Sequence, residues 1–568
     1  MSALDWLVLL GTLLGIATYG VWKTRGVSAE GHLRGDPTVR WPTIGLAVMA
    51  TQASAITFLS TPGQAYEDGL RFVQFYFGLP LAMVVLSSTF VPRFFRAKVF
   101  TAYELLESRF DLKTRLLAAL LFLIQRGLSA GITIYAPAII LSRVLGWPLD
   151  LTTVAIGLVV IVYTVAGGST AVAQTQKLQM LVMMGGMAVA LVYVVLALPS
   201  EVSFGDAVSV AGALGKMNAI DLSFDPTSRY TLWSGLTGGF FLAMAYFGTD
   251  QSQVQRYITS RSIAESRMGM LFNGLFKVPM QFFILLTGVM VLVFHIYVQP
   301  PVFFNESELK RVRQTVQAPA LEAAEAAHAR AFEEKRTAAQ AYVAARDNTD
   351  ETALETARVR LVAADQKMQA ARADAKAVIK AAHPDAETKD ADYIFISFVI
   401  RYLPTGLVGL LLAVIFSGAM SSVSGELTAL GSTATVDFYK RVLRPDATDA
   451  HFLRMSKVFT IVFGLLAMSF AAFASLIDNL IQAVNLLGSL FYGTVLGIFL
   501  VAFYVKRVKG TAVFIAALLA ESLVIGAFLL SDLGFLWFNV IGAAGVVVFG
   551  LLLQQMLPRT TDAAAAPG

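Results

Sequence analysis

Cysteine is absent from this chain of 568 residues, and charged side chains make up only 15% of it. Without cysteine the protein has no disulfide, no thiolate metal site and no thiol nucleophile. Histidine is scarce, and its five copies are scattered at His32, His295, His328, His383 and His451. No HExxH spacing and no paired catalytic carboxylates accompany them, so the sequence does not indicate an enzyme.

Apolar residues, in contrast, account for 56% of the chain. Their runs are long enough to cross a bilayer, at roughly 20 residues per helix. We expect an all-α integral membrane protein with about 13 spans. These lie near 3–22, 42–62, 70–92, 116–144, 149–166, 171–198, 231–257, 268–298, 394–436, 452–476, 478–504, 509–531 and 535–556. The segment 394–436 is too long for one span, which predicts a short surface helix before Pro404 and a membrane helix after it.

Lysine and arginine are concentrated in alternate loops, as the positive-inside rule requires. The loops 93–115 and 437–451 are basic, whereas Glu67, Asp150 and Asp532 lie in loops that are poor in lysine and arginine. No basic residue precedes the first apolar run, so we interpret it as a retained helix rather than a signal peptide. We therefore expect a multi-pass protein of a bacterial inner membrane, with its N-terminus outside and its C-terminus in the cytoplasm.

Residues 305–390 break this pattern, because they are rich in Ala, Glu, Lys, Arg and Gln. They predict two antiparallel helices, 309–346 and 350–381, joined by a turn at 347–350. The topology places this hairpin outside the cell. Two interpretations remain open: a solvated insertion that decorates the membrane domain, or a docking site for an extracytoplasmic partner.

Polar residues gather at membrane depth between Phe416 and Tyr439. Lipid disfavours such side chains, so they indicate a functional site that faces the interior of the bundle or an aqueous path. Hydroxyl and carbonyl oxygens with little formal charge suit a hard, weakly held cation. The polar residues of this segment include Ser421, Ser422, Ser424, Glu426, Thr428, Ser432, Thr433 and Thr435.

Two other spans, 42–62 and 231–257, are polar and interrupted. The first carries Thr51, Gln52, Ser54 and Thr57 and is expected to stop at the sequence Ser-Thr-Pro-Gly of residues 60–63. A break in it would free carbonyl groups such as those of Ala50 and Ala53. The second contains glycines at 235, 238, 239 and 248. Each of these spans begins a set of about five, which is the sequence mark of an inverted repeat with a midplane site.

Four motifs now carry a resemblance to a known family. They are Tyr163-Thr-Val-Ala-Gly-Gly168 leading to Gln179, Gly248-Thr-Asp-Gln-Ser-Gln-Val-Gln-Arg256, Met420-Ser-Ser with Asp437-Phe-Tyr-Lys440, and Ile481-Gln482 with Leu487-Gly488. Together they resemble the sodium/solute symporter family, which includes sodium-coupled glucose, proline, sialic acid, monocarboxylate and iodide transporters. The resemblance spans nearly everything except the hairpin.

The resemblance implies the five-plus-five inverted-repeat fold of the leucine transporter and a bound Na⁺. By position, the sodium ligands would be the carbonyls of Ala50, Ala53 and Gly418 and the hydroxyls of Ser421 and Ser422. The alternative for the two serines is a hydrogen bond to their own helix.

The chain departs from the family where some members hold a second sodium. Gln176 stands in place of the acid, and Gly425 replaces a hydroxyl, although Ser424 remains. A second sodium is therefore in doubt, and Lys177, alone or paired with Glu426, is a hypothetical electrostatic replacement for it. The alternative is that Lys177 extends to the cytoplasmic surface.

Contacts with the solute are expected from Ser54, Thr57, Gln74, Arg126, Asp250 and Gln482, by the same resemblance. Arg126 lies deep within its span and needs an acceptor, which a solute carboxylate would supply bidentately. An arginine on this helix holds the carboxylate in the sialic acid branch of the family. An internal pair with Asp250 is the alternative.

The sequence thus predicts a sodium-coupled symporter that imports a small organic solute, with an organic or sugar acid favoured and a neutral sugar second. A proton-coupled transporter that uses Lys177 and a solute-sensing membrane protein are the alternatives. No nucleic-acid partner is expected. We divide the chain into 1–41, a first repeat at 42–198, a second repeat at 199–304 and 391–504, the hairpin at 305–390, and two C-terminal helices at 505–568.

Overall fold

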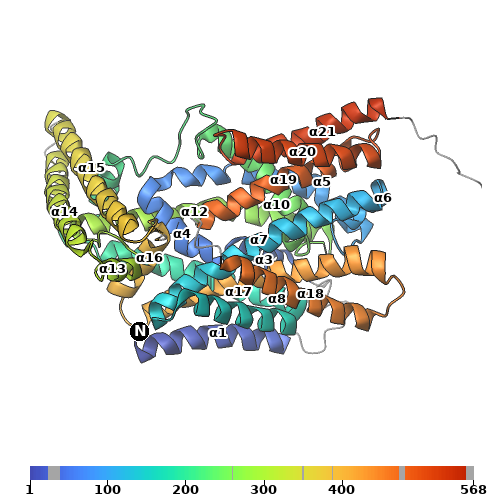
Figure 1. Ribbon diagram of the computed structural model, residues 1–568, viewed down its shortest axis with the longest axis horizontal. Coiled ribbons are helices and arrows are strands. Elements are labelled where there is room, and N and C mark those ends of the chain that lie inside the picture. The colour runs from blue at the N-terminus through green and yellow to red at the C-terminus, as the bar shows by residue number, and fades with distance from the viewer. Residues whose placement is uncertain are drawn as a thin grey trace, which may run out of the picture.

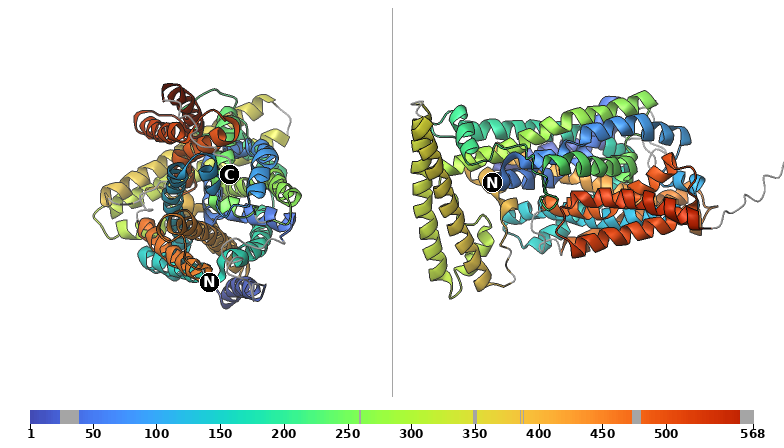
Figure 2. Two further views of the ribbon diagram at one scale, coloured as in Figure 1. Left: turned by 90° about the vertical axis from the view of Figure 1, so that its right-hand side faces the viewer. Right: turned by 90° about the horizontal axis from the view of Figure 1, so that it is seen from above.

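The computed structural model describes residues 1–23, 39–258, 260–347, 351–384, 386, 388–472 and 480–557. Every regular element in these ranges is a helix. Most of the helices lie side by side along the long axis of the molecule, and a helical hairpin stands across one end of this bundle (Figures 1 and 2). The N-terminus lies at the hairpin end, whereas the last helix ends at the opposite end. This arrangement agrees with the expected placement of the N-terminus and the hairpin on one side of the membrane.

The helices follow one another along the described chain as α1 (Ala3–Lys23), α3 (Trp41–Gln52), α4 (Ala55–Asp68), η1 (Gly69–Tyr76), α5 (Leu79–Ala97), α6 (Glu104–Arg109), α7 (Leu112–Leu145), α8 (Leu149–Leu196), α9 (Phe204–Ala213), η2 (Ser234–Gly238), α10 (Gly239–Thr249), α11 (Gln251–Val254), α12 (Ile263–Tyr297), α13 (Glu306–Val312), α14 (Ala318–Asp347), α15 (Glu351–Ala382), α16 (Ala391–Tyr402), α17 (Leu407–Thr433), η3 (Ala434–Leu443), α18 (Asp449–Ala471), α19 (Leu480–Tyr504), α20 (Gly510–Leu530) and α21 (Leu536–Met556).

Eleven helical segments of the described chain are long and apolar enough to cross a membrane, so the expected count of 13 is not reached. The two predicted spans without such a segment are 42–62 and 231–257. Each is divided into shorter pieces: α3 and α4 for the first, and η2, α10 and α11 for the second. These are the same two spans whose polar and glycine residues predicted a discontinuous helix.

The first break lies at Ala53 and Ser54, between α3 and α4. Ala53 has ψ of 80° and Ser54 is extended, so the helical hydrogen bonding stops there. The prediction that residues 60–63 end this helix is wrong, because α4 continues through Pro62 to Asp68. Nearly all of α4 is buried, and buried backbone groups must remain hydrogen-bonded. The helix therefore tolerates a proline that would have ended it on the surface.

The spans 149–166 and 171–198 both lie in the element α8, which contains two separate segments that could cross a membrane, Leu149–Ala166 and Val172–Leu196. The hydroxyl of Tyr163 lies 2.7 Å from that of Thr175, although these residues are 12 positions apart. A straight helix would separate them by about 18 Å. The chain therefore turns back between the two spans, as predicted.

The segment 394–436 is divided at Pro404 into α16 and α17, as predicted. However, α16 is not a surface helix: residues 391–399 are all buried, and α16 packs against α4. Residues 394–396 and 398–400 are all apolar, and together they cover most sides of the helix, which is typical of a buried helix. Gly63 of α4 makes this packing close, since a Cβ there would lie 2.0 Å from the carbonyl oxygen of Ala391.

The hairpin consists of α14 and α15, with the separate turn of helix α13 before them. The predicted first helix, 309–346, is thus split after Val312, and Pro319 lies at the start of α14, where proline is favoured. Of the predicted turn, residues 348–350 lie outside the described residues. The two helices meet through small side chains such as Ala357 and Ala375 and through a buried ion pair of 2.6 Å between Lys335 and Asp365.

Asp390 anchors the hairpin to the membrane domain, at the residue before α16. Its carboxylate is fully buried and accepts hydrogen bonds of 2.8 and 3.0 Å from Arg372 and one of 2.7 Å from the backbone N–H of Phe304. Lys376 lies 3.0 Å away. Burial alone would raise the pKa of Asp390, but the charges of Arg372 and Lys376 outweigh burial and hold it below its ordinary value. The ionised carboxylate is therefore part of the folded structure.

Candidate sodium and solute sites

Helix α17 crosses the break between α3 and α4 at very close range. A Cβ on Gly418 would lie 2.9 Å from the backbone nitrogen of Ala55 and 3.0 Å from the carbonyl carbon of Ser54. The glycine therefore allows the backbone of α17 to contact the interrupted backbone directly. Small residues at a helix crossing permit this approach in membrane proteins.

Ser421 and Ser422 face this break. The Ser421 hydroxyl donates to the carbonyl oxygen of Ala50 at 2.9 Å, and the Ser422 hydroxyl donates to that of Thr51 at 3.2 Å. Both hydroxyls are buried and bond across to α3 rather than to their own helix. Of the five predicted sodium ligands, Ala50, Ser421 and Ser422 are thus in contact, while Ala53 and Gly418 lie at the break. Carbonyl and hydroxyl oxygens beside a broken helix are the donor set that transporters use for Na⁺.

Gln176 of α8 contacts both helices at this break. Its amide nitrogen donates to the Thr51 hydroxyl and to the Ser421 carbonyl, both at 3.0 Å. Ser424 also donates to the Ser421 carbonyl, at 3.2 Å. The predicted coupling residues Gln176 and Ser424 therefore lie against the serine pair. Lys177, in contrast, is half-buried and makes no ion pair within the described part of the chain.

Glu426 forms its ion pair with Arg126 instead of Lys177, at 3.1 Å. Arg126 of α7 also pairs with Asp250 and hydrogen-bonds to Tyr492 of α19. The Tyr492 hydroxyl donates to Asp250 at 2.8 Å. Asp250 is the residue at which α10 breaks from α11, and its other oxygen accepts from the N–H of Ser252. The internal pair that the sequence left open for Arg126 is thus present.

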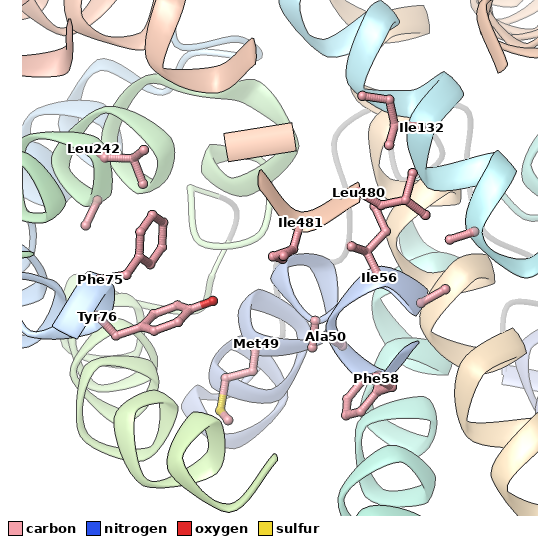
Figure 3. Close-up of a cluster of buried hydrophobic side chains, with 14 of the residues drawn as sticks. Met49, Ala50, Ile56, Phe58, Phe75, Tyr76, Ile132, Leu242, Leu480 and Ile481 are labelled. Atoms are coloured by element: carbon pink, nitrogen blue, oxygen red, sulfur yellow. The ribbon is translucent and has the colours of Figure 1, made fainter. Parts of the chain in front are cut away.

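Arg126, Glu426 and Tyr492 line a cavity of about 70 Å³ between the two broken helices and helices α7 and α19. The cavity is small beside ligand pockets, which measure roughly 300–1,000 Å³, so a solute can enter only when the surrounding helices move apart. Phe75 and Tyr76 lie on one side, with the hydroxyl of Tyr76 directed toward the space between them and α3, while Ile481 and Ile56 lie on the other (Figure 3).

Three of the predicted solute contacts line this cavity: Ser54, Thr57 and Arg126. Asp250 lies behind Arg126. Gln74 and Gln482 are engaged elsewhere in this structure. Gln74 binds the backbone of Tyr230 and Asp221, and Gln482 joins Gln64 at 2.9 Å and Arg229 at 2.6 Å.

Several residues of the cavity wall were not predicted as solute contacts from the sequence; they are Gln52, Tyr76, Thr133, Tyr246, Asn485 and Tyr492. The side-chain oxygen of Gln52 and the amide nitrogen of Asn485 are buried without a partner in the described structure. Such groups are costly unless a ligand or water satisfies them. Polar or aromatic residues within an apolar span were the available signal for all six.

The motif Asp437-Phe-Tyr-Lys440 has a structural role. Asp437 accepts from Arg115 at 2.7 Å and from Thr101 at 2.9 Å, and Glu107 joins Arg115 at 2.8 Å to Arg441 at 2.6 Å. This network ties η3 to the segment around α6 and to the start of α7, at the end of the bundle opposite the hairpin.

Comparison with known proteins places these features in a family. The family model described as "Sodium:solute symporter family" matches residues 34–319 and 368–520, and its gap falls within the hairpin. The human sodium/iodide cotransporter is 33% identical over 285 residues, and sodium-coupled monocarboxylate transporter 1 of Xenopus laevis is 32% identical over 273. These matches cover 49% and 47% of this chain but only 44% and 43% of the relatives' own lengths.

The sodium/sialic acid symporter SiaT of Proteus mirabilis (strain HI4320) is 25% identical over 566 residues, covering 97% of this chain and 95% of that protein. A solved structure of a Na⁺-coupled sialic acid symporter in a substrate-bound outward-open state superposes with a TM-score of 0.76, 22% identity and 98% coverage of both chains. That likeness establishes the shared fold. With the match of the family model over most of its length, this chain belongs to the sodium:solute symporter family.

Proposed function

We propose that this protein is a sodium-coupled symporter that imports a small organic solute by alternating access. The observation that carries the proposal is the contact of Ser421 and Ser422 with the carbonyls of Ala50 and Thr51, at the break of the first interrupted helix. A cation at this place would hold α17 against α3. Because α3 and α4 also line the central cavity, sodium and solute would bias the same conformational equilibrium.

The two interrupted helices support a division into two inverted repeats, 42–198 and 199–304 with 391–504. Helices α3 and α4 begin the first repeat, and α10 and α11 belong to the second. Residues of α3, α4 and α10 line the cavity, so both repeats contribute to its wall. Movement of one repeat against the other around this fixed site would open the cavity alternately to the two sides.

We favour an organic acid as the solute, with a neutral sugar second. Arg126 lines the cavity, and its Nε atom is buried without a partner in the described structure. A solute carboxylate could bind the guanidinium bidentately by displacing one of its internal carboxylates. Iodide, monocarboxylates and sialic acid, which the relatives are named for, are all anions. The unpartnered amide groups of Gln52 and Asn485 would serve hydroxyl or carbonyl groups of the same solute.

The test is a thermal-shift screen of the purified protein in sodium or choline chloride, across sugars, sugar acids and monocarboxylates. A ligand that binds the folded state must raise apparent stability. We expect stabilisation by a carboxylate solute that requires sodium and is lost in Ser422→Ala. Thr435→Ala is the matched control, because this hydroxyl on the same chain segment bonds only to Gly431 one turn before it.

A solute that stabilises the protein equally in sodium and choline, with a response that depends on pH, would favour the proton-coupled alternative with Lys177. Solute binding without uptake into proteoliposomes would favour a sensor. For the hairpin we propose a structural role through its contact with Asp390, and docking of an extracytoplasmic partner is the alternative.

A further inference from the structure

A second cavity, of about 510 Å³, lies where the hairpin meets the membrane domain. Its wall combines α13, the first turns of α14, the residues 299–302 that follow α12, and Arg401 of α16, all at the hairpin end of the molecule (Figure 1). None of its lining residues lines the central cavity. The volume falls within the range of ligand pockets, roughly 300–1,000 Å³.

Part of this wall comes from the segment that the family model does not match. The model covers residues 34–319 and 368–520, so Glu325 and His328 of α14 lie outside the matched residues. Both line the cavity. The role of this cavity is therefore not implied by membership of the family, and it must be inferred from the residues themselves.

His328 brings a buried polar atom without a partner to the cavity wall. The residue is 1% exposed, and its Nε2 atom has no hydrogen-bond partner in the described part of the chain. Burial, together with the charges of Arg372 and Lys335, lowers the pKa of His328 to about 4. The ring is therefore neutral at neutral pH and can either donate or accept a hydrogen bond. A buried polar atom of this kind is normally satisfied by water or a ligand.

The charged side chains of the wall leave one cation in excess. Arg313 pairs with Glu325 at 2.8 Å, and Arg401 pairs with Glu306. Lys310 of α13 is exposed and has no ion pair among the residues that the structure describes. A carboxylate would balance this charge and could bind the ammonium group through a charge-assisted hydrogen bond.

We propose that this cavity is a second binding site, for a small organic anion with one carboxylate, on the side of the membrane that we propose to be external. Lys310 binds the carboxylate, and His328 binds a hydroxyl or carbonyl group of the same molecule. Pro300 and Leu309 give the wall apolar surface for a carbon skeleton, which an inorganic anion would not use. The bound anion joins the hairpin to α16, the helix that packs against α4.

The test is isothermal titration calorimetry of the purified full-length protein with the choline salts of acetate, pyruvate, gluconate and N-acetylneuraminate. Sodium is omitted, because the proposed contacts of this cavity do not include it. We expect at least one of these anions to bind. Lys310→Ala should weaken that binding about tenfold, the effect of losing one charge-assisted hydrogen bond. His328→Phe keeps the volume of the ring but removes its nitrogens, and it should also weaken binding.

Lys367→Ala is the matched control, since this exposed lysine of α15 pairs with Glu334 and lies outside the cavity wall. It should keep the native affinity. Absence of binding for all four anions would overturn the inference, and so would native affinity in Lys310→Ala. A loss of the same size in Lys367→Ala would overturn it too, because it would show only a general attraction to a positive surface.

The Lys310 variant decides alone if His328→Phe does not elute as a monodisperse species, because the side chain of Lys310 is exposed. Sodium-dependent stabilisation in the thermal-shift screen is a separate measurement. The proposed symport and the proposed external site can therefore fail independently of one another.

Discussion

At the residue scale, the buried carboxylates Asp250 and Glu426 both form ion pairs with Arg126. Asp250 accepts from Arg126 and Tyr492 and also caps the short helix α11, whereas Glu426 pairs with Arg126 from within helix α17. The two carboxylates therefore share one arginine but differ in how much of the local structure depends on them.

We predict that Asp250→Asn destabilises the protein more than Glu426→Gln. Removing one partner of a buried ion pair costs roughly 3–5 kcal/mol, and Asp250 also supports the break between α10 and α11. Thermal unfolding in detergent, without solute, measures the difference. Equal losses in the two variants would contradict the unequal roles that the contacts assign.

The residues of the proposed sodium site were assigned from sequence, because the family motifs fix their positions along two helices. Ser421 and Ser422 face α3 because α17 crosses the break between α3 and α4 at these residues. The partners of Gln74, Gln482 and Glu426 could not be predicted in the same way, since a long polar side chain bonds to whichever group tertiary packing brings within reach.

At the element scale, helix α4 is held between two other helices by glycine contacts. A Cβ on Gly288 of α12 would lie 2.1 Å from the carbonyl oxygen of Pro62, and Gly63 contacts α16 in a similar way. The atoms that face these glycines belong to the backbone of Pro62 and Ala391, so they cannot move aside as a flexible side chain can. The position of α4, and with it the cavity wall, depends on these two glycines.

We predict that Gly288→Ala lowers the free energy of unfolding by at least about 1–3 kcal/mol, the usual range for overpacking. Gly185→Ala is the matched control, since nothing lies within 4 Å of a Cβ there. Alanine is a better helix former by about 1 kcal/mol, so this control should be neutral or slightly stabilised. A stable Gly288→Ala protein would show that α4 and α12 can separate.

The hairpin gives a second prediction at this scale. Asp390 has a pKa below its ordinary value, so its contribution is present above pH ~4 and is lost as pH falls through the folded pKa. Asp390→Asn at pH 7.5 should therefore imitate acid and leave Arg372 and Lys376 as unpaired cations.

We expect faster tryptic cleavage within α14 and α15 in Asp390→Asn than in the native protein. Asp374→Asn, a change at an exposed position of α15, is the control and should be cleaved at the native rate. Unchanged cleavage of Asp390→Asn would mean that apolar packing alone holds the hairpin in place.

At the scale of the whole molecule, the arrangement in Figure 1 separates two ends of the bundle. The hairpin and the N-terminus lie at one end, and the network of Arg115, Glu107 and Asp437 lies at the other. From the positive-inside rule we propose that the second end faces the cytoplasm.

The absence of cysteine makes this orientation directly testable. We expect a membrane-impermeant maleimide to label Gln340→Cys, on an exposed face of α14, in intact spheroplasts. Asp446→Cys, in the exposed loop after η3, should be labelled only after the membrane is permeabilised. The reverse pattern would invert the proposed topology and the direction of transport.

The membrane class, the family, the two interrupted helices and the hairpin could be predicted from the sequence alone. They follow from hydropathy, motif spacing and composition, which are local properties of the chain. Tertiary structure decided where α4 ends, that α16 is buried, and which groups satisfy Arg126. These features depend on contacts between segments far apart in the chain, and the free energy of burying a proline or a charge is set by the neighbours that packing supplies.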